Sequence, residues 1–398
     1  MDTYEDGAGL RDVSCDHAAQ VAVTYTHSPV NLVETLGLEI GVRQAGTPAA
    51  DRAAQAVADA FGDAGLEPGF HEFGMLGYEA DEPELEVDGE RWDAGPCIYS
   101  NPTDGTVEGR VRRLGTHSIG GFFPEADVFA VEDEGGSELA RLLMTPFGGP
   151  AIPFLTGARQ IAVGPAVFIS GEDAARLRER EGVLARVRVG GRFVPGLTER
   201  NVVAELRGQS EEAIVVSAHY DSVWRGPGVI DNATGVEGVR RIAENLAGHG
   251  HMRSLIFIAF AAEEIGCIGS RSWIFDSEVT GELGRIKACV NLDCIAHGDR
   301  LELMASPKAL ADRLEGFAGE LGLGERYDLN IGPAGPGVDA FPFHEKGIPA
   351  ATVSHFGYDE YHLPTERLEL VDEQRLADSV EVATLLIESL LEQPVQPD

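Results

Sequence analysis

The chain has 398 residues, 43% of them hydrophobic, and carries 66 acidic against 31 basic residues for a formal net charge of −35. This length and hydrophobic content predict a globular protein with one large domain and an insertion, or with two domains. The acidic excess makes nucleic acid and anionic membranes poor partners and excludes the usual classes of protein that bind them.

The basic residues are unusual, because only three of them are lysines, at Lys287, Lys308 and Lys346. An acid excess along the whole chain with so little lysine is typical of proteins adapted to molar salt. The alternative is an ordinary acidic enzyme from a genome that favours arginine. The dependence of the melting temperature on salt would separate these two interpretations.

Nothing in the sequence predicts export or membrane insertion. The first ten residues lack the basic start and apolar core of a signal peptide, and no run of about 18 apolar residues occurs. The five cysteines are scattered without Cys-x-x-Cys spacing, which fits a reducing compartment. Cys267 is expected to pack as a small hydrophobic residue. We therefore expect a cytoplasmic protein with no membrane partner.

The first part of the chain predicts two amphipathic helices, over residues 29–40 and 48–66. In the second, Ala53, Val57 and Phe61 recur at helical spacing, and we expect the helix to end at Gly65.

From residue 86 to 194 the pattern changes to short strand-like runs separated by Gly, Pro and Asp, with one short helix at 172–181. The strand-like runs are 97–99, 106–112, 127–131, 166–169 and 184–189. The apolar segment from Pro146 to Phe154 is a candidate loop facing the site. We interpret 86–194 as a small β-rich inserted module, with 1–85 and 195–398 forming the main domain.

From residue 201 onward strands and helices alternate, which is typical of a largely parallel sheet with helices on both faces. The strand candidates are 202–206, 213–216, 255–260, 289–292 and 350–353, and the helix candidates are 234–247, 308–321 and 373–392. Asn232 or Thr234 is the expected N-cap of the first of these helices. We therefore expect an α/β three-layer sandwich with a mostly parallel central sheet and its site at the carboxyl ends of the strands.

Four of the predicted strands end in potential metal ligands. Their ends are followed by His219, Asp221 and Asp231; by Glu263 and Glu264; by Asp293; and by His355, Tyr361 and His362. Imidazole and carboxylate without thiolate favour zinc in an open catalytic site. The set exceeds what a single tetrahedral zinc with a water needs, so two metals are favoured, with Asp231 as the candidate bridge.

The motifs at these strand ends resemble those of a known family in order and spacing. They are His219-Tyr-Asp-Ser222, Gly228-Val-Ile-Asp-Asn-Ala-Thr-Gly235, Phe260-Ala-Ala-Glu-Glu-Ile-Gly-Cys-Ile-Gly-Ser270, Asn291-Leu-Asp293 and Tyr361-His-Leu-Pro364. They resemble the co-catalytic di-zinc exopeptidases, which include bacterial zinc aminopeptidases, glutamate carboxypeptidase and, further off, glutaminyl cyclases and the transferrin receptor. The resemblance covers residues 200–372 and, more weakly, 37–73. Residues 86–194 resemble the protease-associated insert of many relatives.

This resemblance implies a binding site for two Zn²⁺ ions. One zinc would take His219 and Asp293, the other would take Glu264 and His362, and Asp231 would bridge them. Asp221 would orient His219. Glu263 would be the general base that activates a metal-bridged water, and Tyr361 would stabilise the oxyanion.

The function implied is that of a zinc-dependent exopeptidase acting on peptide substrates, most simply an aminopeptidase that hydrolyses N-terminal peptide bonds. A carboxypeptidase or a related di-zinc amidohydrolase is the alternative, because Arg225 could pair with a substrate carboxylate, although it could equally pair with neighbouring acids. A metal-free binding scaffold would leave the carboxylates crowded without a cation. Side-chain preference and oligomeric state stay open.

The chain also departs from the family pattern. It has Val338-Asp-Ala340 where relatives often have Ser-Asp-His, and Glu366 where they usually have Asp. His297, His344 and His355 match no family role, and we expect them to be hydrogen-bonded structural histidines.

Overall fold

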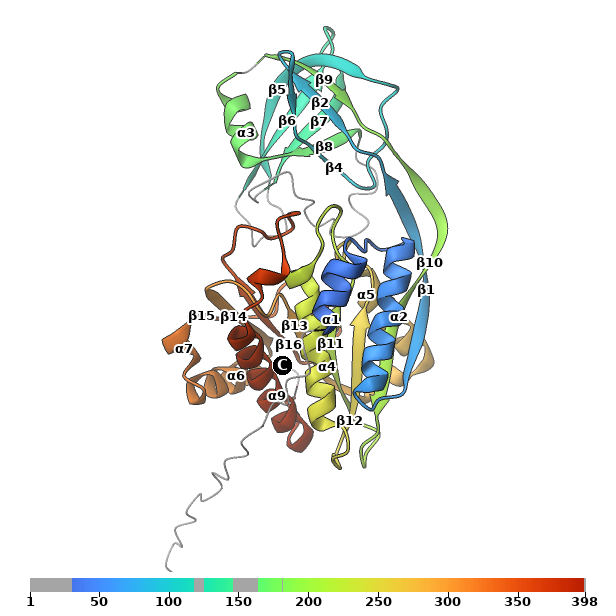
Figure 1. Ribbon diagram of the computed structural model, residues 1–398, viewed down its shortest axis with the longest axis vertical. Coiled ribbons are helices and arrows are strands. Elements are labelled where there is room, and N and C mark those ends of the chain that lie inside the picture. The colour runs from blue at the N-terminus through green and yellow to red at the C-terminus, as the bar shows by residue number, and fades with distance from the viewer. Residues whose placement is uncertain (1–30, 118–124, 146–163, 181, 397–398) are drawn as a thin grey trace, which may run out of the picture.

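The computed structural model describes residues 31–117, 125–145, 164–180 and 182–396. Its larger part is an α/β body, above which stands a smaller β-rich module (Figure 1). A long antiparallel ribbon of β1 (Pro68–Ala80) and β10 (Gly191–Leu206) joins the two parts. The predicted loop from Pro146 to Phe154 lies outside the described residues.

The body is built on an eight-stranded sheet in the order β1-β10-β12-β11-β13-β16-β14-β15. Beyond the ribbon its strands are β11 (Ala213–His219), β12 (Ser254–Phe260), β13 (Ile286–Asp293), β14 (Arg300–Ser306), β15 (Asp328–Gly332) and β16 (Ala350–Phe356). The strands β12, β11, β13 and β16 run parallel, whereas β10 and β14 pair antiparallel with the two ends of that group. The predicted α/β class is confirmed, but the sheet is mixed rather than mostly parallel, because β10 returns from the module beside β12 and β14 reverses beside β16.

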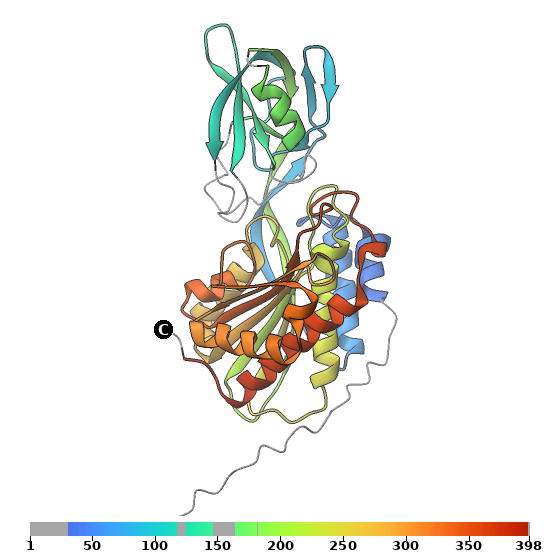
Figure 2. The same cartoon turned by 90° about the vertical axis from the view of Figure 1, so that its left-hand side faces the viewer.

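Helices cover both faces of this sheet and give three layers (Figure 2). Along β11, Ile214 and Val216 face a core shared with α2, α4, α6 and α9, while Val215 faces a second core shared with α5 and α8. Because these strands are buried on both faces, they form continuous apolar runs in the sequence. The helices are α1 (Asn31–Glu34) with a π-helical continuation (Thr35–Ile40), α2 (Pro48–Asp63), α4 (Gly235–Leu246), α5 (Ile268–Thr280), α6 (Lys308–Glu320), α7 (Leu323–Arg326), α8 (Phe341–Glu345) and α9 (Glu373–Glu392).

Helix α2 shows how the sequence sets these elements. Its N-cap is Thr47, whose Oγ1 accepts the N–H of Ala50 at 3.3 Å, and Pro48 occupies the first turn, where its missing N–H costs nothing. Val57 and Phe61 are fully buried. The helix ends two residues before Gly65, whose φ of 87° glycine adopts without strain.

The module contains a second eight-stranded sheet, in the order β3-β2-β9-β5-β6-β7-β8-β4. Its strands are β2 (Glu84–Val87), β3 (Glu90–Trp92), β4 (Gly95–Pro96), β5 (Val107–His117), β6 (Ala126–Glu132), β7 (Glu138–Met144), β8 (Ala166–Ile169) and β9 (Leu184–Arg188), and its helix is α3 (Gly171–Arg178). Phe129 and Leu142 are fully buried in a core separate from that of the body, together with Leu177 of α3.

In the module, one predicted strand is absent and the observed strand β7 was not predicted. Residues 97–99 do not form a strand: they are part of a turn, with Tyr99 at a φ of 62° and its hydroxyl donating to the carbonyl of Leu76 at 2.7 Å. Strand β7 has the sequence Glu-Leu-Ala-Arg-Leu-Leu-Met, whose residues favour helix, and pairing with β6 and β8 overrides that preference. The predicted boundaries at 86 and 194 fall inside β2 and β10, and the division into 1–85, 86–194 and 195–398 stays a prediction.

Within the described residues, no helix is both long enough and apolar enough to cross a membrane.

Candidate metal centre

The eight site residues predicted from the sequence come together at the carboxyl ends of the parallel strands. His219 is the last residue of β11, and Asp293 is the last residue of β13. Glu263 and Glu264 lie in the turn between β12 and α5, and Tyr361 and His362 lie in the segment after β16. The loop from Tyr220 to Gly228 leads from β11 to Asp231 and is the longest connection among them.

Asp231 lies between the two histidines and divides its carboxylate oxygens between them. Its Oδ1 is 3.1 Å from Nε2 of His219, and its Oδ2 is 3.0 Å from Nε2 of His362. Its backbone N–H donates to Oε1 of Glu366 at 3.3 Å, which fixes the residue from behind. The single carboxylate of Asp231 therefore contacts both imidazole rings at once.

A second carboxylate accompanies each histidine. Oδ1 of Asp293 is 3.5 Å from Nε2 of His219, and Oε2 of Glu264 is 3.2 Å from Nε2 of His362. Glu263 stands beside the first group, with its Oε2 at 3.9 Å from Nε2 of His219. The site thus has two lobes that share Asp231.

All six of these ionisable residues are buried, none with more than 6% of its surface exposed. Apart from the imidazole nitrogens of the two histidines, Oδ1 of Asp231 and both carboxylate oxygens of Glu264 have no hydrogen-bond donor. Buried carboxylates without donors are costly unless a cation balances them. Potential ligand atoms of His219, Asp231 and Glu264 lie within 4.8 Å of one another, and so do those of Asp231, Asp293 and Cys294. The oxygen and nitrogen donors present fit zinc ions.

The same groups perturb one another's protonation. Burial raises the pKa of Glu264 to about 7 and holds the pKa of Glu263 well above its ordinary value. Burial alone would lower the pKa of His219 and His362, but the carboxylates of Asp293 and Glu264 raise it well above the ordinary value. A positive charge held between the carboxylates, as a proton or as a cation, is therefore what the site requires.

Asp221 lies on the far side of the His219 ring from the two lobes. Its Oδ1 is 3.5 Å from Nδ1 of His219 and also accepts the backbone N–H of Glu263 at 3.0 Å. Its Oδ2 accepts the N–H of Glu264 at 3.3 Å. One buried carboxylate thus holds the turn that carries the two glutamates and lies beside Nδ1 of the imidazole, which is where a group that orients a metal-binding histidine would be.

Asn232 joins Asp231 to the neighbouring strand. Its Oδ1 accepts the N–H of Gly235, at the start of α4, and the N–H of Cys294, at 2.9 and 3.1 Å. The side chain therefore caps α4, as predicted, and ties it to the end of β13. A Cβ at Gly235 would lie 2.1 Å from Asn232 Oδ1, so glycine is needed for this close approach.

The loops of the centre contain several side-chain-bearing residues in the left-handed backbone region, which is costly for them. These are Arg225 (φ 64°), Ala262 (φ 57°), Cys267 (φ 54°), Cys294 (φ 55°) and His362 (φ 61°). Such conformations concentrate at functional sites, where the surrounding structure holds them in place. The ring of Tyr361 stacks on that of His362 with centroids 4.0 Å apart, and Tyr361 is buried.

Sequence reasoning missed Arg43, which is fully buried and follows the first helical segment. Its guanidinium donates to the carbonyl of Tyr220, to that of Pro227 at 2.5 Å and to that of Gly228 at 2.7 Å. Burial lowers its pKa to about 10, so it stays charged at neutral pH. Arg43 therefore clamps both ends of the 220–228 loop, and a single arginine between two helices gives no sequence signal for that role.

Two further buried acids lie near the centre. Glu366 contacts Asp231, and burial raises its pKa to about 8. Asp339 accepts the hydroxyl of Ser270 at 2.6 Å, and burial raises its pKa to about 7. The sequence marked both positions only as departures from the family pattern.

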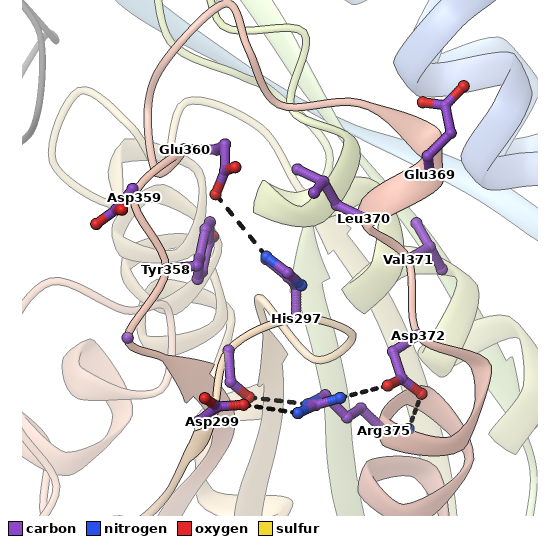
Figure 3. Close-up of a pocket in the computed structure, with 12 residues that line it drawn as sticks. His297, Asp299, Tyr358, Asp359, Glu360, Glu369, Leu370, Val371, Asp372 and Arg375 are labelled. Carbon is purple, nitrogen blue, oxygen red and sulfur yellow. Dashed lines mark hydrogen bonds and ion pairs between the residues drawn. The ribbon is translucent and has the colours of Figure 1, made fainter.

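A separate hollow, shown in Figure 3, is lined by none of the residues of the centre. It has a volume of about 570 Å³ and is lined by loops after β13 and β16, including His297 and Glu360, whose side chains approach to 3.8 Å. Arg375 is held there by Asp299 and Asp372. His297 is thus outside the centre.

The other two histidines without a family role also lie outside the centre. His355 is buried with Nδ1 3.1 Å from the carbonyl oxygen of Gly298, and burial lowers its pKa to about 4, as for a neutral structural histidine. His344 lies in α8 and packs its ring against that of Phe341.

Arg225 is paired within the protein. It contacts the carboxylates of Glu82 and Asp93, with Nη1 at 3.3 Å from Oδ1 of Asp93, and its guanidinium lies over the ring of Trp224. Since Glu82 and Asp93 belong to the entry of the module, Arg225 ties the 220–228 loop to the module.

Known proteins are similar to this chain in sequence and in fold. The model of peptidase family M28 matches residues 201–387. The chain is 26% identical to aminopeptidase YwaD of Bacillus subtilis over 62% of this chain and 56% of that protein, so the match spans little more than half of YwaD. It is similar to the structure of BSAP, a zinc aminopeptidase from Bacillus subtilis, with a TM-score of 0.70 and 22% identity over 90% of this chain and 93% of that one. For the aminopeptidase of Aneurinibacillus sp. strain AM-1, the TM-score is 0.68 and the identity 25%, over 93% of each chain.

Proposed function

Because the chain belongs to peptidase family M28 through residues 201–387, we propose that it is a zinc-dependent aminopeptidase that hydrolyses N-terminal peptide bonds. The observation that carries this proposal is the division of the Asp231 carboxylate between His219 and His362, each accompanied by a second buried carboxylate. This arrangement supports two metal positions that share one bridging ligand.

The proposed ligands are the five residues predicted from the sequence. His219 and Asp293 would hold one zinc, Glu264 and His362 would hold the other, and Asp231 would give one oxygen to each. Three carboxylates carry three negative charges, which two dications more than balance. When bound, the zinc ions polarise the scissile carbonyl and make water acidic enough to be deprotonated near neutral pH.

Glu263 is the proposed general base. It is 2% exposed and lies beside the His219 lobe, with Oε2 at 3.9 Å from Nε2 of that histidine. Its carboxylate would take a proton from the attacking water and return it to the leaving amine. Burial holds its pKa above the ordinary value, which makes the carboxylate a stronger base than an exposed glutamate.

Asp221 and Tyr361 have supporting roles in this proposal. Asp221 would hold the His219 ring in its orientation and keep the Glu263–Glu264 turn in place through two backbone hydrogen bonds. Tyr361, buried against His362, would stabilise the negative charge that develops on the carbonyl oxygen.

The direction of cleavage is proposed from the charges around the centre. Its carboxylates can hold the ammonium group of a free N-terminus. A carboxypeptidase needs a cation for the substrate carboxylate, and Arg225, the candidate on the 220–228 loop, is already paired with Glu82 and Asp93. This pairing favours the aminopeptidase over the carboxypeptidase.

We also propose that the module is a protease-associated-type insert that borders the approach to the centre. Ile98, at its lower end, lines a small pocket together with Asp221, Trp224 and Glu264. The β1–β10 ribbon and the Arg225 contacts support this position.

The experiment combines metal content with a substrate panel. Zinc is counted per chain after dialysis, and rates are measured for an aminoacyl anilide, its N-acetylated form, and an N-blocked peptide with a free C-terminus. We expect two zinc ions and cleavage of the free aminoacyl anilide alone. Cleavage of the N-blocked peptide without cleavage of the anilide would replace the aminopeptidase by the carboxypeptidase, and a protein without zinc or activity would contradict both.

A further inference from the structure

Two buried cysteines direct their thiols at two carboxylates of the centre. Sγ of Cys267 lies 3.4 Å from Oε1 of Glu263, and Sγ of Cys294 lies 3.4 Å from Oδ1 of Asp293. Both cysteines are unpaired, and neither is more than 4% exposed. These distances are in the range of S–H···O hydrogen bonds, in which the thiol donates and the carboxylate accepts. Cys267 is therefore more than a small hydrophobic residue.

The backbone at both positions is unfavourable for cysteine. Cys267 has a φ of 54° and Cys294 a φ of 55°, in the left-handed region that glycine and asparagine adopt most readily. The main chain is held there by hydrogen bonds: the N–H of Cys267 donates to the carbonyl of Glu263 at 2.8 Å, and the N–H of Cys294 donates to Oδ1 of Asn232 at 3.1 Å. A side chain carried in such a conformation, twice and each time against an acid of the centre, points to a role for the thiol.

A neutral thiol donates a hydrogen bond and a thiolate does not. At Cys267, burial raises the pKa of the thiol well above the ordinary value, and the carboxylates of Glu263 and Asp339 act in the same direction. At Cys294, the distance of 3.4 Å from Sγ to Oδ1 of Asp293 is the observation that makes the thiol a donor to this carboxylate.

We propose that Cys267 and Cys294 are positioning residues of the centre. Cys267 holds Oε1 of Glu263, so that the other oxygen, Oε2, faces His219 and the reacting water. Cys294 holds Oδ1 of Asp293 in the orientation that metal binding requires. This inference rests on the proposed function, since Glu263 and Asp293 have these roles only in a zinc peptidase.

The test compares Cys267→Ala, Cys267→Ser, Cys294→Ala and Cys294→Ser with the control Cys289→Ala. Cys289 is equally buried, in β13, but its Sγ lies 3.6 Å from the hydroxyl of Ser217 and its substitution removes no donor to Glu263 or Asp293. For each purified full-length variant the measurements are kcat, KM, zinc affinity by competition with a chelator, and melting temperature.

We expect Cys267→Ala to lower kcat roughly three- to tenfold with KM and zinc affinity unchanged, the size of effect that loss of one weak hydrogen bond to a charged group produces. Cys294→Ala is expected to weaken zinc affinity by a similar factor. Serine keeps a donor at each position and should restore most of the loss. Cys289→Ala should lower the melting temperature as the others do, through its cavity, but leave kcat and zinc affinity unchanged.

Different results overturn different statements. Equal kcat in Cys267→Ala and Cys289→Ala overturns the role of Cys267, and equal zinc affinity in Cys294→Ala and Cys289→Ala overturns that of Cys294. A thiolate-to-metal charge-transfer band in the cobalt-substituted wild type that Cys294→Ala abolishes makes Cys294 a ligand and overturns its assignment as a donor. A wild type that binds zinc but cleaves no peptide overturns the proposed function, and the zinc titrations then still test Cys294.

Discussion

The centre and the β-rich module handle charge in opposite ways. In the module, arginines and acids pair across the exposed faces of strands, as Arg112 does with Glu132 and Arg188 with Glu84. In the centre, four carboxylates and two imidazoles are buried against one another with at most 6% of any residue exposed. An exposed pair contributes about 0–1 kcal/mol and is screened by salt, whereas a buried charge left without a partner costs several kcal/mol.

Because its charges are buried, the centre should be more sensitive to substitution than the module is. The module can lose an ion pair and remain folded, because water replaces the partner. The centre should not tolerate loss of Asp231, because this is the carboxylate that His219 and His362 share and that the proposed function places between two cations. Substitutions in the two regions should therefore differ in kind as well as in size.

The largest effect is expected for Asp231→Ala. Removing the carboxylate shared by His219 and His362 should eliminate bound zinc and lower kcat by more than about a thousandfold, because the metal that activates the water is lost with it. Zinc per chain and turnover are the measurements. The matched control is Asp127→Ala in the module, where a buried aspartate paired with Arg113 and Arg178 is removed. The control should have a lower melting temperature and keep its zinc. If Asp231→Ala also keeps its zinc, the centre does not depend on Asp231 in the way proposed.

Glu263→Gln should have the next largest effect, and only the turnover number should change. The amide preserves the shape of the side chain and leaves all five proposed ligands in place, so zinc content and melting temperature should stay near those of the wild type. Turnover should fall by about a hundredfold or more, the usual contribution of general base catalysis. Near-normal turnover in zinc-loaded protein would remove Glu263 from this role.

The centre could be predicted from the sequence because its residues follow buried strands with a clear apolar pattern, either directly or after a short loop. His219 and Asp293 end two strands that are almost entirely buried and mostly apolar, and parallel strands bring their carboxyl ends to one edge. Arg43 could not be predicted, since it reaches the 220–228 loop across 179 positions of sequence and acts through backbone carbonyls, which leave no pattern.

The module and the sheet edges could be predicted only in part. Strand β15 lies at the edge of the sheet with no fully buried residue, and β14 beside it carries the charged residues Arg300 and Glu302, so neither has a continuous apolar run. In the module, β7 consists largely of helix-favouring residues and becomes a strand only through its neighbours. The ribbon of β1 and β10 extends through both parts, so composition gives no clear boundary between them.

Salt should act on the surface and not on the centre. At about 0.01 M ionic strength the Debye length is about 30 Å, so repulsion within a chain of net charge −35 extends across the molecule, whereas at 1 M it is about 3 Å. We expect the melting temperature of zinc-loaded protein to rise by on the order of 10 °C between about 0.05 and 3 M potassium chloride, or a few kcal/mol for a chain of this size.

Two comparisons sharpen the salt prediction. Sodium sulfate at the same ionic strength separates charge screening from salting-out of apolar surface. Zinc content measured along the series should stay constant, because the charges of the centre are buried. A flat melting curve in potassium chloride would contradict salt adaptation and return the scarcity of lysine to genome composition.

The smallest effect is expected for Glu199→Gln, in the ribbon that joins the two regions. Glu199 is 3% exposed and its Oε2 accepts no hydrogen bond. Burial, with Asp221 and Asp51 in support, raises its pKa to about 8.

The sign of its pH dependence follows from that shift. An unfolded glutamate has a pKa of about 4.3, so between that value and about 8 the folded state keeps a proton that the unfolded state releases. The stability that this proton provides is complete below about pH 4 and is lost as the pH rises through 8. Glutamine does not titrate, so the melting temperature of Glu199→Gln relative to wild type should increase by a few degrees from pH 5 to pH 9, with most of the increase below pH 8. Glu302→Gln, which replaces a carboxylate paired with Arg300 at 2.7 Å, controls for the introduction of an amide and should lack this increase. If the difference in melting temperature between Glu199→Gln and wild type is constant over this range, Glu199 is ionised in the folded protein. The ribbon would then tolerate a negative charge, as the exposed faces of the module do.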